Sequence, residues 1–201
     1  MNVFPSISEF NSSKKTIVTI GTFDGVHIGH QKIIEKLIQE TKKADCESLI
    51  LTFFPHPRMV LNGSSSIKLL NTINEKSSLL EKMGLDNLVI HPFDKKFSNL
   101  SAEEFVKTIL VDSFNIKKII IGYDHRFGNN RAANIDDLIS FGKKYDFEVE
   151  QISAEEINEV TISSTKIRNA LSEGNCQLAN EYLGYPYFLT GIVEKGKSIG
   201  R

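Results

Sequence analysis

Short apolar runs that alternate with helical patterns are the feature that most constrains how this chain can fold. The runs are rich in Val, Ile and Leu, and they cover residues 17–20, 48–54, 88–90, 117–122 and 147–152. Continuous runs of this kind are typical of strands in a parallel sheet whose two faces are both covered. Apolar residues recur at helical spacing over residues 27–44, 74–83, 101–110, 135–144, 163–173 and 177–183. The alternation predicts an α/β fold with an open, Rossmann-like parallel sheet.

Polar and glycine-rich sequence follows the predicted strands at the point where they end. The segments are DGVHIGH after the first strand, PHPR after the second, YDHRFGNNR after the fourth and ISSTKIR beyond the fifth. In open α/β sheets, ligands bind outside the carboxyl ends of the strands. The sequence therefore predicts that these segments form one site at a single edge of the sheet.

The first of these segments has the pattern of an anion site. Gly21, Asp24 and Gly25 end the strand. His27 and His30 follow three residues apart, which places both imidazoles on one face of the next helix. Because free N–H groups and the helix dipole attract anions at a helix N-terminus, we expect a cradle for a triphosphate. A plainer interpretation is that one histidine caps the helix and the other lies at the surface. A zinc site would need a third protein ligand, which the neighbouring sequence does not offer.

A second anion site is indicated at residues 163–168. Hydroxyl and N–H groups gather there at a helix start, and Arg168 follows one turn along. An ordinary N-cap before a solvated helix would explain the same residues. Taken alone, the segment leaves both interpretations open.

The string HIGH at residues 27–30 resembles the signature of the HIGH nucleotidyltransferase superfamily, and ISSTKIR is similar to that superfamily's second nucleotide motif. The resemblance implies that His27 and His30 stabilise the ATP phosphates while the α-phosphorus is attacked, and that Thr165 and Arg168 act from the opposite side. In such transfers the protein mainly positions groups and neutralises developing charge. The residues expected to be catalytic are His27, His30 and Arg168. Those expected to bind ATP are Gly21, Phe23, Asp24, Gly29, His30, Ser164, Thr165 and Arg168.

Two further motifs narrow the resemblance to one family. TFFPHPR at residues 52–58 and IGYDHRFG at residues 121–128 accompany the GTFDGVHIGHQ segment in the same order. Together they resemble the N-terminal FMN adenylyltransferase module of bacterial bifunctional riboflavin kinase/FAD synthetases, over residues 16–186. The resemblance implies the nucleotidyltransferase form of the α/β fold and a flavin site built from these two motifs.

The implied flavin contacts come from both motifs. Phe54, Pro55 and Phe127 would face the isoalloxazine, and Arg58 or Arg126 would pair with the FMN phosphate. Asp124 stands where many members of the family have Asn, and it would contact the ligand or help to position magnesium. The two other histidines of these motifs are expected either as structural residues or as ligand contacts, namely His56 and His125.

Composition limits the other classes of function. The chain has 201 residues, 24 of them basic and 25 acidic, with a formal net charge of -1, so nothing indicates a broad surface for nucleic acid or membranes. Cys46 and Cys176 lie far apart without a CxxC motif, which argues against structural zinc and a disulfide framework. The N-terminus lacks a signal-peptide pattern, and no apolar run reaches membrane-spanning length. We therefore expect a cytoplasmic protein, whose oligomeric state the sequence does not indicate.

The sequence changes character after residue 183, where we place a domain boundary. Residues 1–183 are expected to form the adenylyltransferase domain. By the resemblance, residues 184–201 begin a β-barrel riboflavin kinase domain, with a strand over residues 187–193. Residues 191–198 also fit the P-loop pattern letter for letter. A working P-loop opens a helix, and only residues 199–201 follow, so we reject that interpretation.

The predicted reaction is the transfer of AMP from ATP to FMN, giving FAD and pyrophosphate, with Mg²⁺ bridging the phosphates. The resemblance implies that a full-length bifunctional protein would also phosphorylate riboflavin. One alternative is a sister nucleotidyltransferase that acts on another phosphomonoester, and another is a non-catalytic flavin-binding protein. A fragment of an aminoacyl-tRNA synthetase fits less well, because the chain is short and has no basic excess.

Overall fold

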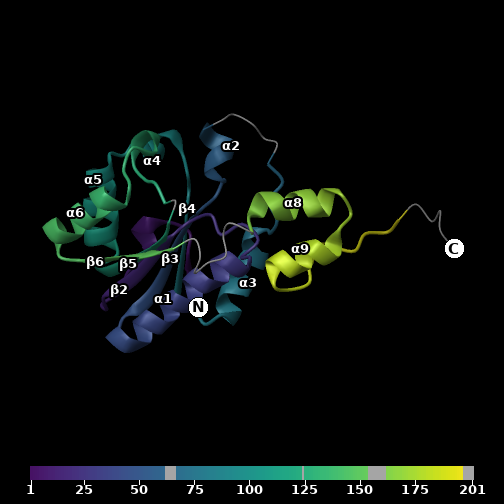
Figure 1. The fold of residues 1–201 in the computed structure, drawn as a ribbon, viewed down its shortest axis with the longest axis horizontal. Helices are drawn as coiled ribbons and strands as arrows, with labels where there is room; N and C mark the ends of the chain where they lie inside the picture. Colours follow the sequence, from purple (N-terminus) through teal and green to yellow (C-terminus); the bar gives the residue numbers. More distant parts are fainter. Residues whose placement is uncertain (62–66, 124, 154–161, 197–201) are drawn as a thin grey trace.

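Six parallel strands form a single sheet at the centre of this computed structural model (Figure 1). The structure describes residues 1–61, 67–123, 125–153 and 162–196. The strand order is β1-β4-β3-β2-β5-β6, and all neighbouring strands run parallel. The strands are β1 (Asn2–Phe4), β2 (Thr16–Ile20), β3 (Glu47–Phe53), β4 (Asn87–His91), β5 (Ile116–Gly122) and β6 (Glu148–Ile152). The predicted α/β class with an open parallel sheet is confirmed.

Helices cover both faces of the sheet, which explains why its central strands bury apolar side chains on both faces. Successive residues of a strand point to opposite faces, so Val18 packs on one face and Ile17 on the other. The first face is covered by η1 (Ile7–Glu9), η2 (Phe105–Ser113) and α6 (Ile135–Tyr145). The second face is covered by α1 (Ile28–Ala44) and α3 (Ile73–Lys82).

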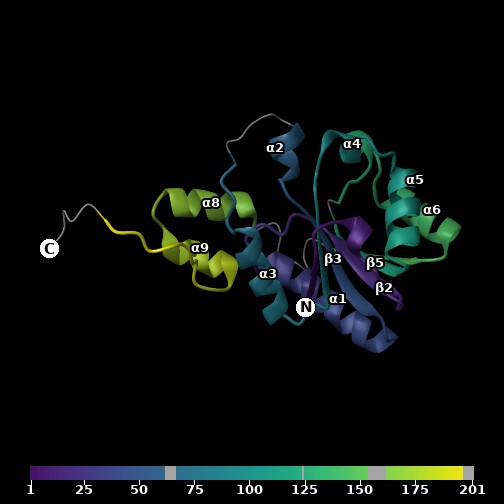
Figure 2. The same cartoon turned by 180° about the vertical axis from the view of Figure 1, so that it is seen from behind.

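Two further helices lie beside the sheet. α8 (Ser164–Ser172) and α9 (Cys176–Leu183) pack together around a third apolar cluster, which includes Ile167 and Leu183. Leu70, from the segment before α3, belongs to this cluster, and Ile28 of α1 packs against it. Figures 1 and 2 both show the helix pair next to α3. The start of α8 is thereby brought to the turn that precedes α1.

The remaining elements are short, namely α2 (Pro57–Leu61), α4 (Lys95–Ser98), α5 (Ala102–Glu104) and η3 (Asn129–Arg131). β1, α2 and α4 were not predicted from the sequence, because three to five residues are too few to show a hydrophobic period. The helix predicted over residues 101–110 is present as α5 and η2, and η2 is π-helical. None of the described helices has the length and apolar character needed to cross a membrane.

The strand predicted over residues 187–193 is wrong. Residues 186–196 form neither strand nor helix in the part of the chain that the structure describes. Ile192 and Val193 are 92% and 99% exposed. An extended segment becomes a strand only when a neighbour pairs with its backbone, and this segment joins neither edge of the six-stranded sheet.

Candidate functional site

The turn after β2 lies where the strand order reverses. From β2 the chain continues to β3 and β4 on one side, and later to β5 and β6 on the other side. Such switch points leave a crevice at the carboxyl ends of the strands, where α/β proteins bind ligands. Three residues of this turn have positive φ, namely Phe23 (45°), Gly25 (85°) and Val26 (37°). Positive φ is unfavourable for Phe and Val, so the surroundings must hold the turn in this shape.

His27 and His30 form a stacked pair at the start of α1. Their ring centroids are 3.6 Å apart, and the ring planes are inclined by 18°. His27 is the N-cap residue, and its Nδ1 accepts a hydrogen bond from the His30 backbone N–H (3.4 Å). A neutral imidazole that accepts at Nδ1 carries its proton on Nε2. His27 therefore caps the helix and still keeps one N–H donor beside His30.

Burial keeps both histidines neutral at neutral pH. It lowers the pKa of His27 to about 4, although the Asp24 carboxylate acts in the opposite direction. Burial also lowers the pKa of His30 well below its usual value, and the neighbouring His27 and Lys76 add to this effect. His30 keeps some exposed surface, but its Nδ1 is buried without a hydrogen-bond partner among the described residues. An anionic ligand would supply negative charge beside these two bases.

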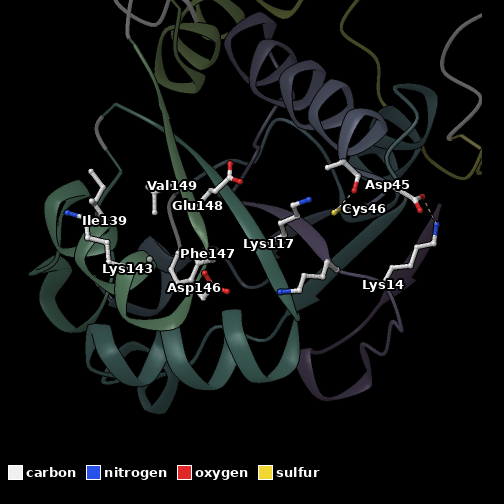
Figure 3. Close-up of a pocket in the computed structure, with 13 residues that line it drawn as sticks. Lys14, Asp45, Cys46, Lys117, Ile139, Lys143, Asp146, Phe147, Glu148 and Val149 are labelled. Carbon is white, nitrogen blue, oxygen red and sulfur yellow. Dashed lines mark hydrogen bonds and ion pairs between the residues drawn. The ribbon is translucent and has the colours of Figure 1, made fainter.

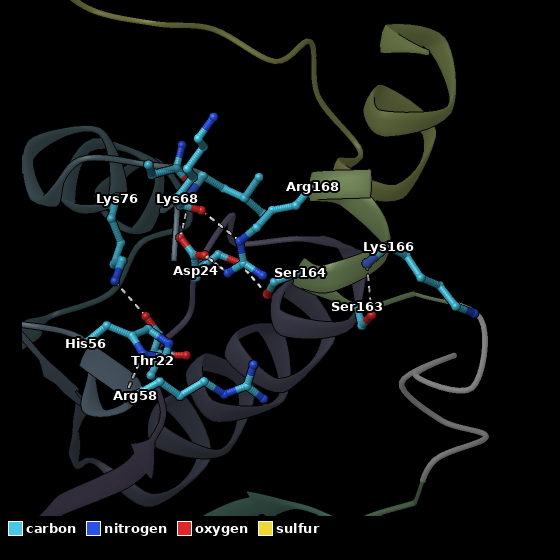
Figure 4. Close-up of polar contacts among 12 residues, drawn as sticks. Thr22, Asp24, His56, Arg58, Lys68, Lys76, Ser163, Ser164, Lys166 and Arg168 are labelled. Carbon is cyan, nitrogen blue, oxygen red and sulfur yellow. Dashed lines mark hydrogen bonds and ion pairs between the residues drawn. The ribbon is translucent and has the colours of Figure 1, made fainter. Parts of the chain in front are cut away.

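Asp24 connects the β2 turn to α8 (Figure 4). Its carboxylate accepts hydrogen bonds from the Arg168 guanidinium and from the Leu70 backbone N–H (2.9 Å). Its backbone carbonyl accepts from the Ser164 hydroxyl (2.9 Å). Arg168 also donates through Nε to the Lys68 carbonyl (2.8 Å). The structure thus brings the turn and the start of α8 together, and it pairs Arg168 with Asp24, which is 2% exposed.

Lys76 is a residue of this site that was not predicted from the sequence. It comes from α3, is 5% exposed, and donates through Nζ to the Thr22 carbonyl (2.6 Å), as Figure 4 shows. Burial lowers its pKa to about 8, although the Asp24 carboxylate acts to raise it. The available signal was its position: Lys76 lies four residues before the buried Leu80, and residues four apart share a helix face.

Asn71 is a second polar residue that the sequence did not single out. It is 4% exposed, and its Nδ2 has no hydrogen-bond partner among the residues that the structure describes. The Tyr185 hydroxyl lies 3.4 Å from its Oδ1. A buried donor without a partner destabilises a protein by roughly 1–3 kcal/mol, which a ligand acceptor would offset.

The other residues predicted to bind ATP differ in how far they are buried. Phe23 is 2% exposed and packs edge-on against His30, with ring centroids 5.1 Å apart, so it supports that imidazole. A Cβ at Gly21 would come within 3.1 Å of the Phe23 ring. Gly29 is buried in the first turn of α1, whereas Thr165 is exposed at the start of α8.

The predicted flavin residues come from two sides of the β2 turn, after β3 and after β5. Phe54 is 50% exposed, and Pro55, Arg58 and Arg126 are exposed as well. They leave aromatic, apolar and basic groups open to a ligand. Asp124 lies outside the described residues.

Phe127 lies in the core, contrary to the expectation of a ring that faces the flavin. It is 7% exposed, its ring centroid is 6.0 Å from that of Phe105, and its backbone exchanges two hydrogen bonds with Ala133 (3.2 Å each). Its packing in the first apolar cluster, beside Phe105, leaves the ring little surface for a ligand. His125 stacks on the same ring with a centroid distance of 6.2 Å. His56 accepts at Nδ1 from the Arg58 backbone N–H (3.1 Å).

A hollow of about 820 Å³ lies at the opposite edge of the sheet (Figure 3). Its lining includes Lys117 at the start of β5 and Glu148 at the start of β6. Lys14 in the same hollow is already paired with Asp45 (3.1 Å). It is therefore a separate groove from the strand-end site. No group of three or more His, Cys, Asp or Glu side chains suited to a metal ion occurs in the described ranges.

Known proteins resemble the chain over most of its length. A model of the family described as FAD synthetase matches residues 9–166. A bifunctional riboflavin kinase/FMN adenylyltransferase of Buchnera aphidicola subsp. Schizaphis graminum is 41% identical over 98% of this chain and 62% of its own length. A FAD synthetase of Listeria monocytogenes is 35% identical over 94% of this chain and 76% of its own length. A crystal structure described as a macrolide-efflux protein from Streptococcus pneumoniae has a TM-score of 0.80 at 26% identity, over 92% of this chain and 60% of that one.

The comparisons cover the part of the chain that forms the candidate site. The chain spans less than two thirds of the Buchnera relative, at 62% of its length. The family match includes the β2 turn, both histidines and the first residues of α8. The Streptococcus structure supports the fold independently of any activity. From the match over residues 9–166 and the two relatives, the chain belongs to the FAD synthetase family.

Proposed function

We propose that this chain transfers AMP from ATP to FMN, forming FAD and pyrophosphate. The observation that carries the proposal is the stacked His27–His30 pair at the helix N-terminus on the switch point of the sheet. An oxygen of the FMN phosphate forms a bond to the α-phosphorus of ATP, and the bond from that phosphorus to the β-phosphate bridging oxygen breaks. No general base is needed, because a phosphate monoester is largely a dianion near neutral pH.

The protein's part in this step is positioning and charge. His27 and His30 offer N–H donors beside the free N–H groups of α1, where negative charge increases in the transition state. Lys76 adds an ammonium group, which is mostly protonated at pH 7 because its pKa is about 8. On the other side, Thr165 and Arg168 hold the leaving pyrophosphate, with Asp24 fixing the guanidinium.

Magnesium enters this site with ATP in our proposal. Mg²⁺ usually keeps several waters and is held by substrate phosphates and one or two carboxylates. The bound ion supplies positive charge to the phosphate oxygens.

We place the flavin on the exposed residues that flank the turn. Phe54 and Pro55 face the isoalloxazine, and Arg58 or Arg126 binds the FMN phosphate. Asp124 stays a candidate for contact with the ligand or magnesium. We also propose that residues 1–183 form the adenylyltransferase domain and that residues 184–201 lead into a riboflavin kinase domain, since the Buchnera relative is named for both activities.

The test is to incubate the purified chain with ATP, Mg²⁺ and FMN and to measure FAD and pyrophosphate by chromatography. We expect equal amounts of both products, and neither without FMN. Pyrophosphate release with a different phosphomonoester alone would identify a sister nucleotidyltransferase. FMN binding without turnover would identify a flavin-binding protein. Riboflavin in place of FMN should stay unphosphorylated by these 201 residues.

A further inference from the structure

Every backbone carbonyl from residue 22 to residue 26 accepts a hydrogen bond. The donors are Lys76 and Thr52 to Thr22, the Val26 N–H to Phe23, Ser164 to Asp24, Tyr185 to Gly25 and Gln31 to Val26. Because the turn contains three residues with positive φ, it depends on outside contacts to stay in one conformation. Side chains from β3, α3, α8, α1 and the segment after α9 share this task.

Tyr185 is the donor from farthest along the chain. Its hydroxyl lies 2.6 Å from the Gly25 carbonyl oxygen, across a sequence separation of 160 residues. The residue stands just after α9 and outside the family match over residues 9–166. It packs against the third apolar cluster, and burial raises the pKa of its hydroxyl to about 12. The hydroxyl therefore keeps its proton, and remains a donor, at any physiological pH.

The segment that follows Tyr185 is also tied to α3. Thr190 donates through its backbone N–H (2.8 Å) and its hydroxyl (2.6 Å) to the same carboxylate oxygen of Glu75. The other oxygen of Glu75 accepts from the Thr72 backbone N–H (2.7 Å) and so closes the capping box of α3. The next residue of α3 is the lysine that holds the start of the turn. The segment thus contacts the turn directly and braces the helix that also holds it.

We propose that Tyr185 is a positioning residue for the nucleotide, and that residues 185–190 form a strap that keeps the β2 turn in its ATP-binding shape. The Gly25 carbonyl comes directly before Val26 and His27, so this hydrogen bond orients the backbone that presents the first imidazole. Without the bond, only a fraction of the molecules hold the turn in the binding shape, and the apparent affinity falls by that fraction. The inference rests on the proposed function, because it takes ATP as the nucleotide.

The experiment compares Tyr185→Phe with Tyr182→Phe. Both variants lose a hydroxyl from a tyrosine at the third apolar cluster, and among the described contacts only Tyr185 reaches the turn. The net value of one hydrogen bond corresponds to about fivefold in an equilibrium constant. We expect Tyr185→Phe to raise the KM for ATP about fivefold. At saturating ATP its kcat, and likewise its KM for FMN, should stay within about twofold of wild type, because ATP restores the bound shape. Tyr182→Phe should match wild type.

Titration calorimetry with ATP alone gives a readout that does not depend on FAD formation. Weaker ATP binding by Tyr185→Phe only, at a melting temperature within about 4 °C of wild type, supports the strap. Equal ATP binding by both variants overturns it. So does a parallel loss of kcat, FMN affinity and melting temperature, since that pattern belongs to a general structural role. If wild type forms no FAD, the proposed function fails, and the calorimetric comparison still decides whether Tyr185 positions the turn for ATP.

Discussion

The pKa values of two groups of titratable side chains in this molecule are shifted in opposite senses, toward the charged forms in one group and toward the neutral forms in the other. Where α1 meets β5 and β6, Lys118 contacts Glu40 (2.9 Å), Glu148 (3.4 Å) and Glu150 (2.9 Å). Burial acts to lower the pKa of Lys118, but hydrogen bonds to Glu150 and Glu40 raise it above its usual value. Hydrogen bonds from Lys118 and Lys43 lower the pKa of Glu40 to about 2. All of these shifts favour the charged forms.

At the β2 turn the shifts favour the neutral forms of the bases. Burial lowers the pKa of His27 to about 4 and that of Lys76 to about 8, and it lowers the pKa of His30 as well. Asp24 is the carboxylate that opposes two of these shifts, and it is already bonded to Arg168. The cluster around Lys118 therefore has its own carboxylates as counter-charges. At the turn, an added anion would stabilise the protonated forms of the bases. That difference supports our proposal that the turn binds the phosphates of ATP.

Removing one acid from each cluster tests this comparison with the largest expected effect. Asp24→Asn should lower the free energy of unfolding by about 3 kcal/mol, because it leaves the partly buried Arg168 without its carboxylate. The matched control is Glu150→Gln, which should lower it by less than about 1 kcal/mol. Lys118 keeps two other carboxylates in that variant. Urea denaturation measures both values, and equal losses would contradict the distinction between the clusters.

His30→Ala tests whether the turn acts on phosphate charge. We expect the turnover of FAD synthesis to fall about 100-fold, because in our proposal the variant removes a donor to the reacting phosphates. The KM for FMN should change by less than about twofold, because we propose that the flavin binds to other residues. Steady-state kinetics with each substrate varied in turn separates the two effects. Wild-type turnover in this variant would exclude the proposed role of the stacked pair.

The lowered pKa of His27 predicts a loss of stability on the acid side. Its pKa is about 4 in the folded protein, against the ordinary histidine value of 6.5 that applies to the unfolded chain. Between these values the unfolded state binds more protons, so the free energy of unfolding falls as the pH falls through this window. One such group contributes at most about 1.4 kcal/mol per pH unit.

The matched variant for this pH test is His27→Asn, which retains an N-cap acceptor for the first turn of α1. It should remove the His27 part of the slope when urea denaturation is compared at about pH 6.5 and about pH 5. Identical slopes for wild type and variant would show that the pKa of His27 is not lowered in the folded protein.

The long elements of the fold were predictable because burial repeats along them. A strand covered on both faces carries apolar side chains toward each face, and α1 shows its apolar stripe over 17 residues. β1 was not predictable, because three residues at the edge of a sheet carry no period. The tail strand was predicted from its apolar residues, but a strand also needs a pairing partner, which the sequence of the segment does not specify.

The site was predictable where its residues follow a strand or open a helix. This applies to the two histidines and to Ser164 and Arg168. Lys76 and Tyr185 were not predictable, because their contacts with the turn span 54 and 160 residues and depend on tertiary packing. The pairing of Arg168 with Asp24, across 144 residues, is of the same kind.

The long spans that close the turn have a consequence for the order of folding. Ser164 meets Asp24 across 140 residues, and Gln31 reaches the Leu183 carbonyl across 152. Contacts of large sequence separation form late, because closing a long loop costs chain entropy before any contact forms. During synthesis the sheet can therefore assemble before α8 and α9 leave the ribosome, while the turn acquires its final shape only afterwards. We expect the amides of the turn to exchange with solvent earlier than those of the central strands, so the catalytic geometry is the last part of the protein to be made and the first to be lost.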